Sequence, residues 1–260
     1  MARGLGKKAG LIRRAILVAL GLLLLWQALV IVLAPPHFML PSPARVGAAL
    51  LARPELVTRD AVTTLVETLI GFASGAALGI ALALTMAFLP PARRFVMPVM
   101  VVSQALPVFA LAPLLVLWFG FGLGSKIVMA TIAIFFPVAS AFHDGLSRTE
   151  TGLLDLARLN RASRAQEVFL IRFPAALPAL GSGLRVAAVY APVGALIGEW
   201  VGASSGLGYA MLQANGRSQT DVVFAALILL AAMSVLLRAA VDAATRPLAP
   251  WAPETFEQRD

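Results

Sequence analysis

The sequence predicts an all-α membrane protein with six transmembrane helices. Hydrophobic residues make up 60% of the 260 residues and charged residues only 13%, against about 45–50% and about 25% in soluble domains. The apolar residues gather in runs of about 20, the length a helix needs to cross a bilayer. The net charge of +8 lies mostly between these runs. This placement indicates a membrane protein with lipid as a partner, and not a nucleic-acid-binding protein.

The six apolar runs are separated by proline, glycine and charged residues, which commonly mark helix boundaries. The runs cover residues 15–34, 62–89, 97–119, 125–143, 178–200 and 222–244. The first run exceeds the ~7–15 apolar residues of a secretory signal, so we expect an uncleaved helix, with a cleaved signal as the alternative.

The distribution of basic residues predicts the topology. With the N-terminus in the cytoplasm, fifteen Lys and Arg fall on the inner side and five, including Lys126, on the outer side. Cytoplasmic loops are enriched in such residues. We therefore expect six spans with both termini cytoplasmic.

Four regions follow from this topology. Residues 1–34 form the basic N-terminus and first span, and residues 35–60 an external amphipathic connection that rests on the membrane surface. Residues 61–246 form the core, with a cytoplasmic loop at about 147–173, and residues 247–260 form a cytoplasmic tail.

A stripe of small residues marks the second predicted span. Gly71, Gly75 and Gly79 are spaced four apart and so share one face of a helix. Such a face lets another backbone approach closely. Packing within the bundle and contact with another subunit are the two interpretations.

Several polar or irregular positions in the predicted spans are candidates for a substrate pathway. Gln104 lies close to Pro107, where the third span can break, and Glu199 and Trp200 end the fifth span at the outer interface. Irregular backbone inside a membrane is tolerated where it is buried in protein or lines a polar cavity.

Two ionisable residues in the spans are functional candidates by their position, and each also has a simpler interpretation. Glu67 lies about one turn into the second span, where it either reaches the outer surface or is stabilised by the helix dipole. Arg185 is expected to reach towards the inner surface.

An arginine-rich stretch, residues 157–180, interrupts the apolar pattern. Ser147 and Glu150 form a capping-box pattern for a helix that ends near Leu159, and Ser163 and Gln166 form a second such pattern. Asn tolerates a left-handed turn, so Asn160 can connect the two helices.

Two prolines bound this stretch. Pro174 is expected to stop the second short helix, and Pro178 to lie in the first turn of the fifth span. The pattern predicts a helix–turn–helix outside the bilayer, with a solvated basic loop on anionic lipid as the alternative.

The same stretch resembles the cytoplasmic loop of permease subunits of ATP-binding-cassette importers. In that family the loop has the pattern E-A-A-x3-G-x9-I-x-L-P. The matching positions are Asp155, Leu156, Ala157, Arg161, Ile171, Phe173 and Pro174. Arg161 replaces the family glycine, and Asn160 beside it could take the strained conformation. The resemblance spans about residues 60–245.

The resemblance implies a type I importer permease in a bacterial inner membrane, working by alternating access. The coupling element that docks on the ATPase would comprise Asp155, Leu156, Ala157, Arg158, Leu159, Asn160, Arg161, Ala162 and Ser163. It implies a pair of ATPase subunits that carry ATP and Mg, a periplasmic or lipid-anchored substrate-binding protein and a second permease copy. No cofactor is expected in this chain, which has no Walker A motif.

Within the family the sequence is most similar to the branch that carries sulfonates, nitrate and hydroxymethylpyrimidine. Residues 103–120 and 198–221 look most like permeases for hydroxymethylpyrimidine, a thiamine precursor. Import of such a pyrimidine is the expected function, with sulfonate, taurine or nitrate import as the alternative.

Two other classes of protein are alternatives. A gradient-driven secondary transporter would usually show internal repeats and paired intramembrane charges, and the sequence shows neither convincingly. An intramembrane serine protease would use Ser204 of a G-x-S-x-G stretch, but it needs a His base, and His37 and His143 are poorly placed. Two His and no Cys also disfavour a metal site.

Overall fold

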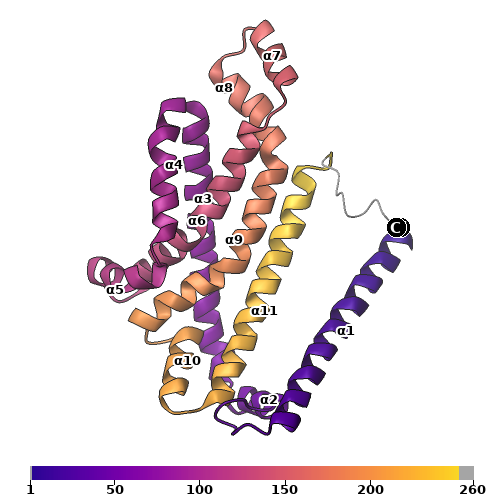
Figure 1. Cartoon of the computed structure of the whole chain (residues 1–260), viewed down its shortest axis with the longest axis vertical. Helices are drawn as coiled ribbons and strands as arrows, with labels where there is room; N and C mark the ends of the chain where they lie inside the picture. The colour runs from indigo at the N-terminus through magenta and orange to yellow at the C-terminus, as the bar shows by residue number, and fades with distance from the viewer. Residues whose placement is uncertain (1, 252–260) are drawn as a thin grey trace.

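The computed structural model describes residues 2–251, without the side chains of residues 2–12, 14 and 15. Within these residues the fold is entirely helical (Figure 1). The helices are α1 (Ala2–Leu33), α2 (Pro43–Ala52), α3 (Val62–Phe88), α4 (Pro90–Ala105), α5 (Val108–Phe119), α6 (Leu123–Ser147), α7 (Thr151–Leu159), α8 (Arg164–Gln166), α9 (Phe173–Gly202), α10 (Leu207–Gly216) and α11 (Thr220–Thr245). Two π-helical turns, Leu56–Ala61 and Glu167–Arg172, precede α3 and α9, and a 3-10 turn, Arg246–Leu248, follows α11. Most of the predicted tail lies outside the described residues.

Five helical segments among the described residues are long and apolar enough to cross a membrane, and α4 with α5 makes up to a sixth. This confirms the all-α membrane class. The third span, predicted over 97–119, is broken near Pro107 as the sequence allowed, because α4 and α5 meet at a bend of 100°. Pro107 lies at the bend and restricts Leu106 before it to an extended conformation (φ −80°, ψ 121°).

The core of the bundle consists of α3, α6 and α9. The predicted glycine stripe on α3 faces α6: Gly71 lies against Ala130, and Gly75 against Ile134. A Cβ added at either glycine would come closer than 3.0 Å to these side chains. The stripe therefore packs within the bundle, which is the first of the two interpretations above.

The first two helices lie at the edge of this core. The apolar run of α1 has no buried residue, and Figure 1 shows the helix standing apart from the others. Near the end of α1, Nε1 of Trp26 donates a hydrogen bond to the carbonyl of Pro41 at 3.1 Å. On α2, Val46 and Ala49 are buried in a cluster with Val222 and Ala225 of the last span. Part of the predicted surface helix thus packs on protein and not on lipid.

Candidate functional site

The α7–α8 segment, defined as residues 151–172, projects from one end of the bundle (Figure 1). Ala157 is buried on the inner face of α7. Leu156 and Leu159 point outward and are 57% and 82% exposed. Apolar side chains on a helix outside the membrane region form the kind of surface that inserts into a groove of another protein.

The start of α7 corrects the first capping prediction. Ser147 is the last residue of α6, and its hydroxyl lies 3.4 Å from Nε2 of His143. Helix α7 begins at Thr151, and Glu150 supplies no side-chain cap. The pattern failed because Leu146 is buried in the bundle core, so core packing extends α6 past the predicted boundary.

The turn after α7 is a Schellman motif, a standard helix ending with one left-handed residue. The N–H of Ala162 donates to the carbonyl of Ala157 at 2.9 Å, and that of Arg161 to the carbonyl of Arg158 at 2.9 Å. The left-handed residue is Arg161 itself, with φ 53°. The expectation that Asn160 would take this conformation is wrong, since its φ is −81°.

Replacing Arg161 with glycine is expected to stabilise the segment, because a left-handed conformation costs a side-chain-bearing residue about 1 kcal/mol that glycine avoids. Thermal unfolding of the purified chain would show this as a higher midpoint. The control Arg161→Ala removes the guanidinium but keeps the Cβ, so equal midpoints for the two variants would contradict the explanation.

The second capping box is confirmed. The N–H of Gln166 donates to Oγ of Ser163 at 3.3 Å, and the N–H of Ser163 donates to Oε1 of Gln166 at 2.8 Å.

The predicted stop at Pro174 is wrong, because one continuous helical segment runs from Arg164 to Gly202. A π turn changes the hydrogen-bond register just before Pro174, which lies in the first turn of α9, where a missing N–H costs little. Pro178 lies inside α9 and not at its start.

Two hydrogen bonds tie the α7–α8 segment to the bundle, and an ion pair within the segment orients one of their donors. Arg164 donates to the carbonyl of Ala87 at the end of α3, at 2.7 Å. Arg172 donates to the carbonyl of Leu146 on α6 at 3.1 Å and pairs with Glu167 at 2.6 Å. A displacement of the segment would therefore act directly on α3, α6 and α9.

A buried ion pair lies near the opposite end of the bundle. Nζ of Lys126 is 2.6 Å from Oε1 of Glu67, and the two side chains are 7% and 1% exposed. Lys126 belongs to α6 and not to an external loop, and Glu67 neither reaches the surface nor depends on the helix dipole alone. Opposite charges in two apolar spans were the signal that sequence reasoning missed.

Glu199 is buried beside this pair, three residues before the end of α9. Its carboxylate lies 2.6 Å from the hydroxyl of Thr64 and accepts the N–H of Gly208. The N–H of Leu207 donates to the same hydroxyl at 2.8 Å. A Cβ at Gly206, where φ is 111°, would come closer than 3.0 Å to the Glu199 carboxylate. Glu199 thus holds the start of α10 against α3.

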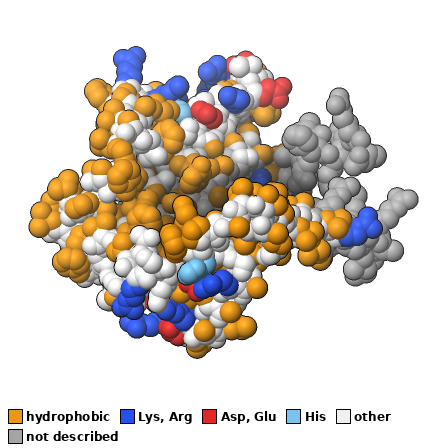
Figure 2. Space-filling view, turned by 60° about the horizontal axis from the view of Figure 1, so that its bottom comes forward, with side chains coloured by type: hydrophobic (Ala, Val, Ile, Leu, Met, Phe, Trp, Pro, Cys, Tyr) orange, Lys and Arg blue, Asp and Glu red, His pale blue; other side chains and the backbone are white. Residues whose placement is uncertain are grey.

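A cavity of about 440 Å³ lies between α4, α5, α6 and α9, with Gln104, Phe109 and Tyr190 in its lining. Of the four predicted pathway residues only Gln104 lines it, since Pro107 shapes the bend beside it and Glu199 and Trp200 lie elsewhere. Figure 2 shows hydrophobic side chains over much of one flank, with Lys and Arg gathered towards the ends.

Residues 75–252 match the family described as the binding-protein-dependent transport system inner membrane component. A probable ABC transporter permease of Haemophilus influenzae is 45% identical, covering 85% of this chain and 90% of its own. The formylaminopyrimidine transport permease ThiX of Halalkalibacterium halodurans is 34% identical, covering 88% and 92%. The riboflavin transport permease RibX of Chloroflexus aurantiacus is 35% identical, covering 88% and 87%.

Among solved structures, the inward-facing MetNI methionine ABC transporter contains a chain with the same fold. The TM-score is 0.67 at 23% identity, and the match covers 76% of this chain and 98% of that chain. The family match and the relatives together exclude an enzyme such as a serine protease. The chain belongs to the binding-protein-dependent inner membrane components, the multi-pass permease subunits of ABC importers.

Proposed function

We propose that this permease imports a pyrimidine of the hydroxymethylpyrimidine type, driven by ATP hydrolysis on a separate pair of ATPase subunits. The observation that supports coupling to the ATPase is the exposed apolar face of α7, where Leu156 and Leu159 are 57% and 82% exposed. The assignment of the substrate rests on the similarity of residues 103–120 and 198–221 to such permeases and on the formylaminopyrimidine transport relative.

The coupling element is residues 155–163, which enter a groove of the ATPase at the cytoplasmic face. Leu156 and Leu159 fill the groove, while the exposed Asp155–Arg158 pair, 2.9 Å apart, borders it. ATP-driven movement of α7 passes to α3 through Arg164 and to α6 through Arg172. The bundle then alternates between inward- and outward-open states.

The solute path follows the cavity lined by Gln104 and Tyr190 between α5 and α9. The Gln104 amide donates to the Ile132 carbonyl at 3.4 Å, a long bond that a pyrimidine edge could replace. A second copy of the chain faces the exposed Phe109 and Tyr190 and completes the path. The substrate-binding protein delivers solute at the opposite end from α7, where Arg53, Arg59 and Arg217 line a smaller cavity.

Uptake by the whole importer reconstituted in vesicles tests this function. Labelled hydroxymethylpyrimidine and formylaminopyrimidine should accumulate inside only with ATP and the cognate binding protein, whereas riboflavin and taurine should not. Accumulation of taurine instead would place the protein in the sulfonate branch. Accumulation that follows an ion gradient without ATP would overturn the ATP-driven mechanism.

A further inference from the structure

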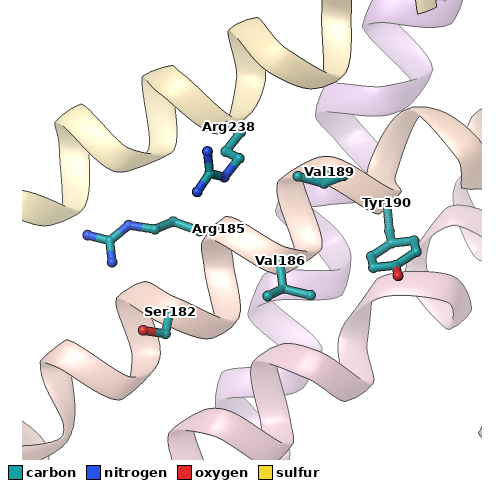
Figure 3. A pocket seen from close by; sticks show the side chains of 6 residues that line it. All are labelled: Ser182, Arg185, Val186, Val189, Tyr190 and Arg238. Atoms are coloured by element: carbon teal, nitrogen blue, oxygen red, sulfur yellow. The ribbon is translucent and has the colours of Figure 1, made fainter. Parts of the chain in front are cut away.

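A cavity with two arginines lies between α9 and α11 (Figure 3). It has a volume of about 540 Å³ and is lined by Ser182, Arg185, Val186, Val189, Tyr190 and Arg238. Figure 3 shows both guanidinium groups in the gap between the two helices, on the side of Ser182. Arginine within a membrane helix is unfavourable without a partner, with a cost that reaches about 2.5–3.5 kcal/mol at the bilayer centre. Two such residues at one cavity therefore call for a compensating partner.

The protein supplies only part of this compensation. Nε of Arg185 lies 2.7 Å from Oδ1 of Asp242, and Nε of Arg246 lies 3.1 Å from Oδ2. Both oxygens of this carboxylate are thus engaged. In the part of the chain that the structure describes, no acidic side chain forms an ion pair with Arg238. The cavity therefore presents a positive charge without a counter-charge from the protein.

Arg238 lies close enough to the end of α11 for its side chain to reach the polar edge of a bilayer. Arg238 precedes Thr245, the last residue of α11, by seven positions. At about 1.5 Å per residue this is about 10 Å from the helix end. An arginine at that depth can extend its guanidinium to the headgroup region. Its neighbours Val235 and Leu236 are 67% and 68% exposed, so the cavity opens onto an apolar surface.

We infer that this cavity binds the phosphate group of an anionic phospholipid from the leaflet on the α7 side. A guanidinium forms two parallel hydrogen bonds to phosphate oxygens, and basic pockets between membrane helices on this side hold anionic headgroups. Arg238 supplies the principal contact and Arg185 the second positive charge. The hydroxyl of Ser182 lines the same cavity as a further donor, and Val189 contacts the glycerol and upper acyl chains.

Native mass spectrometry of the assembled permease–ATPase complex tests this site. The complex is taken from nanodiscs with equal amounts of phosphatidylglycerol and phosphatidylcholine and then stripped of loosely held lipid. Wild type is expected to retain phosphatidylglycerol in preference to phosphatidylcholine. Arg238→Gln should lower that retention about tenfold, the loss expected when a charged hydrogen-bonding partner is removed, and Arg238→Lys should restore part of it.

Arg94→Gln serves as the matched control, because Arg94 is an exposed arginine on α4 outside the cavity. Equal losses in the Arg94 and Arg238 variants would overturn the proposal in favour of general surface charge. Full displacement of phosphatidylglycerol by inorganic phosphate would overturn the lipid assignment in favour of a soluble anion. If the Arg238→Gln complex does not assemble, lipid retention by the wild-type complex tests the proposal by itself. Equal retention of the two lipids by wild type would also overturn the proposal.

Discussion

Replacing Lys126 with methionine is expected to destabilise the folded chain by about 3–5 kcal/mol, the cost of leaving a buried charge without its partner. The Glu67 carboxylate is 1% exposed, and its Oε2 already lacks a hydrogen-bond partner. Water cannot reach it to replace the lysine. Thermal unfolding followed by tryptophan fluorescence would show a large drop in midpoint, and assembly with the ATPase would fall with it.

Two further variants make this prediction specific. The double variant Lys126→Met with Glu67→Met removes both charges, so it should regain most of the lost stability. Arg158→Met breaks the exposed pair with Asp155, 72% and 63% exposed, and should cost less than about 1 kcal/mol. A double variant as unstable as Lys126→Met would show that the pair is not the cause.

Exchanging both Leu156 and Leu159 for glutamate is expected to abolish ATP-driven transport while leaving thermal stability unchanged. Both side chains are exposed and pack on little within the chain, so their loss costs the fold little. In a docked groove, central apolar residues each contribute about 2 kcal/mol or more, so binding to the ATPase should weaken by a factor of hundreds or more. Co-purification with the ATPase and uptake into vesicles are the two measurements.

Arg148→Glu is the control for added negative charge, because Arg148 is exposed at the same end of the molecule but outside α7. It should leave ATPase binding nearly unchanged. Retained ATPase binding and transport in the double glutamate variant would refute the assignment of α7 as the coupling element.

Features set by local spacing could be predicted from the sequence. Glycines four apart must share a helix face, and Gly71 and Gly75 do lie together against α6. The Ser163–Gln166 capping box forms as its pattern requires, since both partners lie within one turn. The Ser147–Glu150 pattern is equally local, yet it failed because packing of α6 outweighs a cap.

Features that join distant segments could not be predicted in this way. Glu67 and Lys126 are 59 residues apart, and each looked ordinary in its own stretch. The role of Glu199 depends on Thr64 and on the start of α10, which only the fold brings together. The conformation of Arg161 likewise follows from hydrogen bonds that the Schellman turn must complete, and not from its intrinsic preference.

Because the segment from Arg164 to Gly202 is helical throughout, a movement at one of its ends is transmitted to the other. Its 39 residues correspond to about 58 Å at helical rise. Pivoting such a rod by ten degrees about its midpoint would shift each tip by about 5 Å in opposite directions. One end follows α7, and the other carries Glu199, which holds the start of α10. A displacement at one end of the segment would thus reach the other end with similar size and opposite direction.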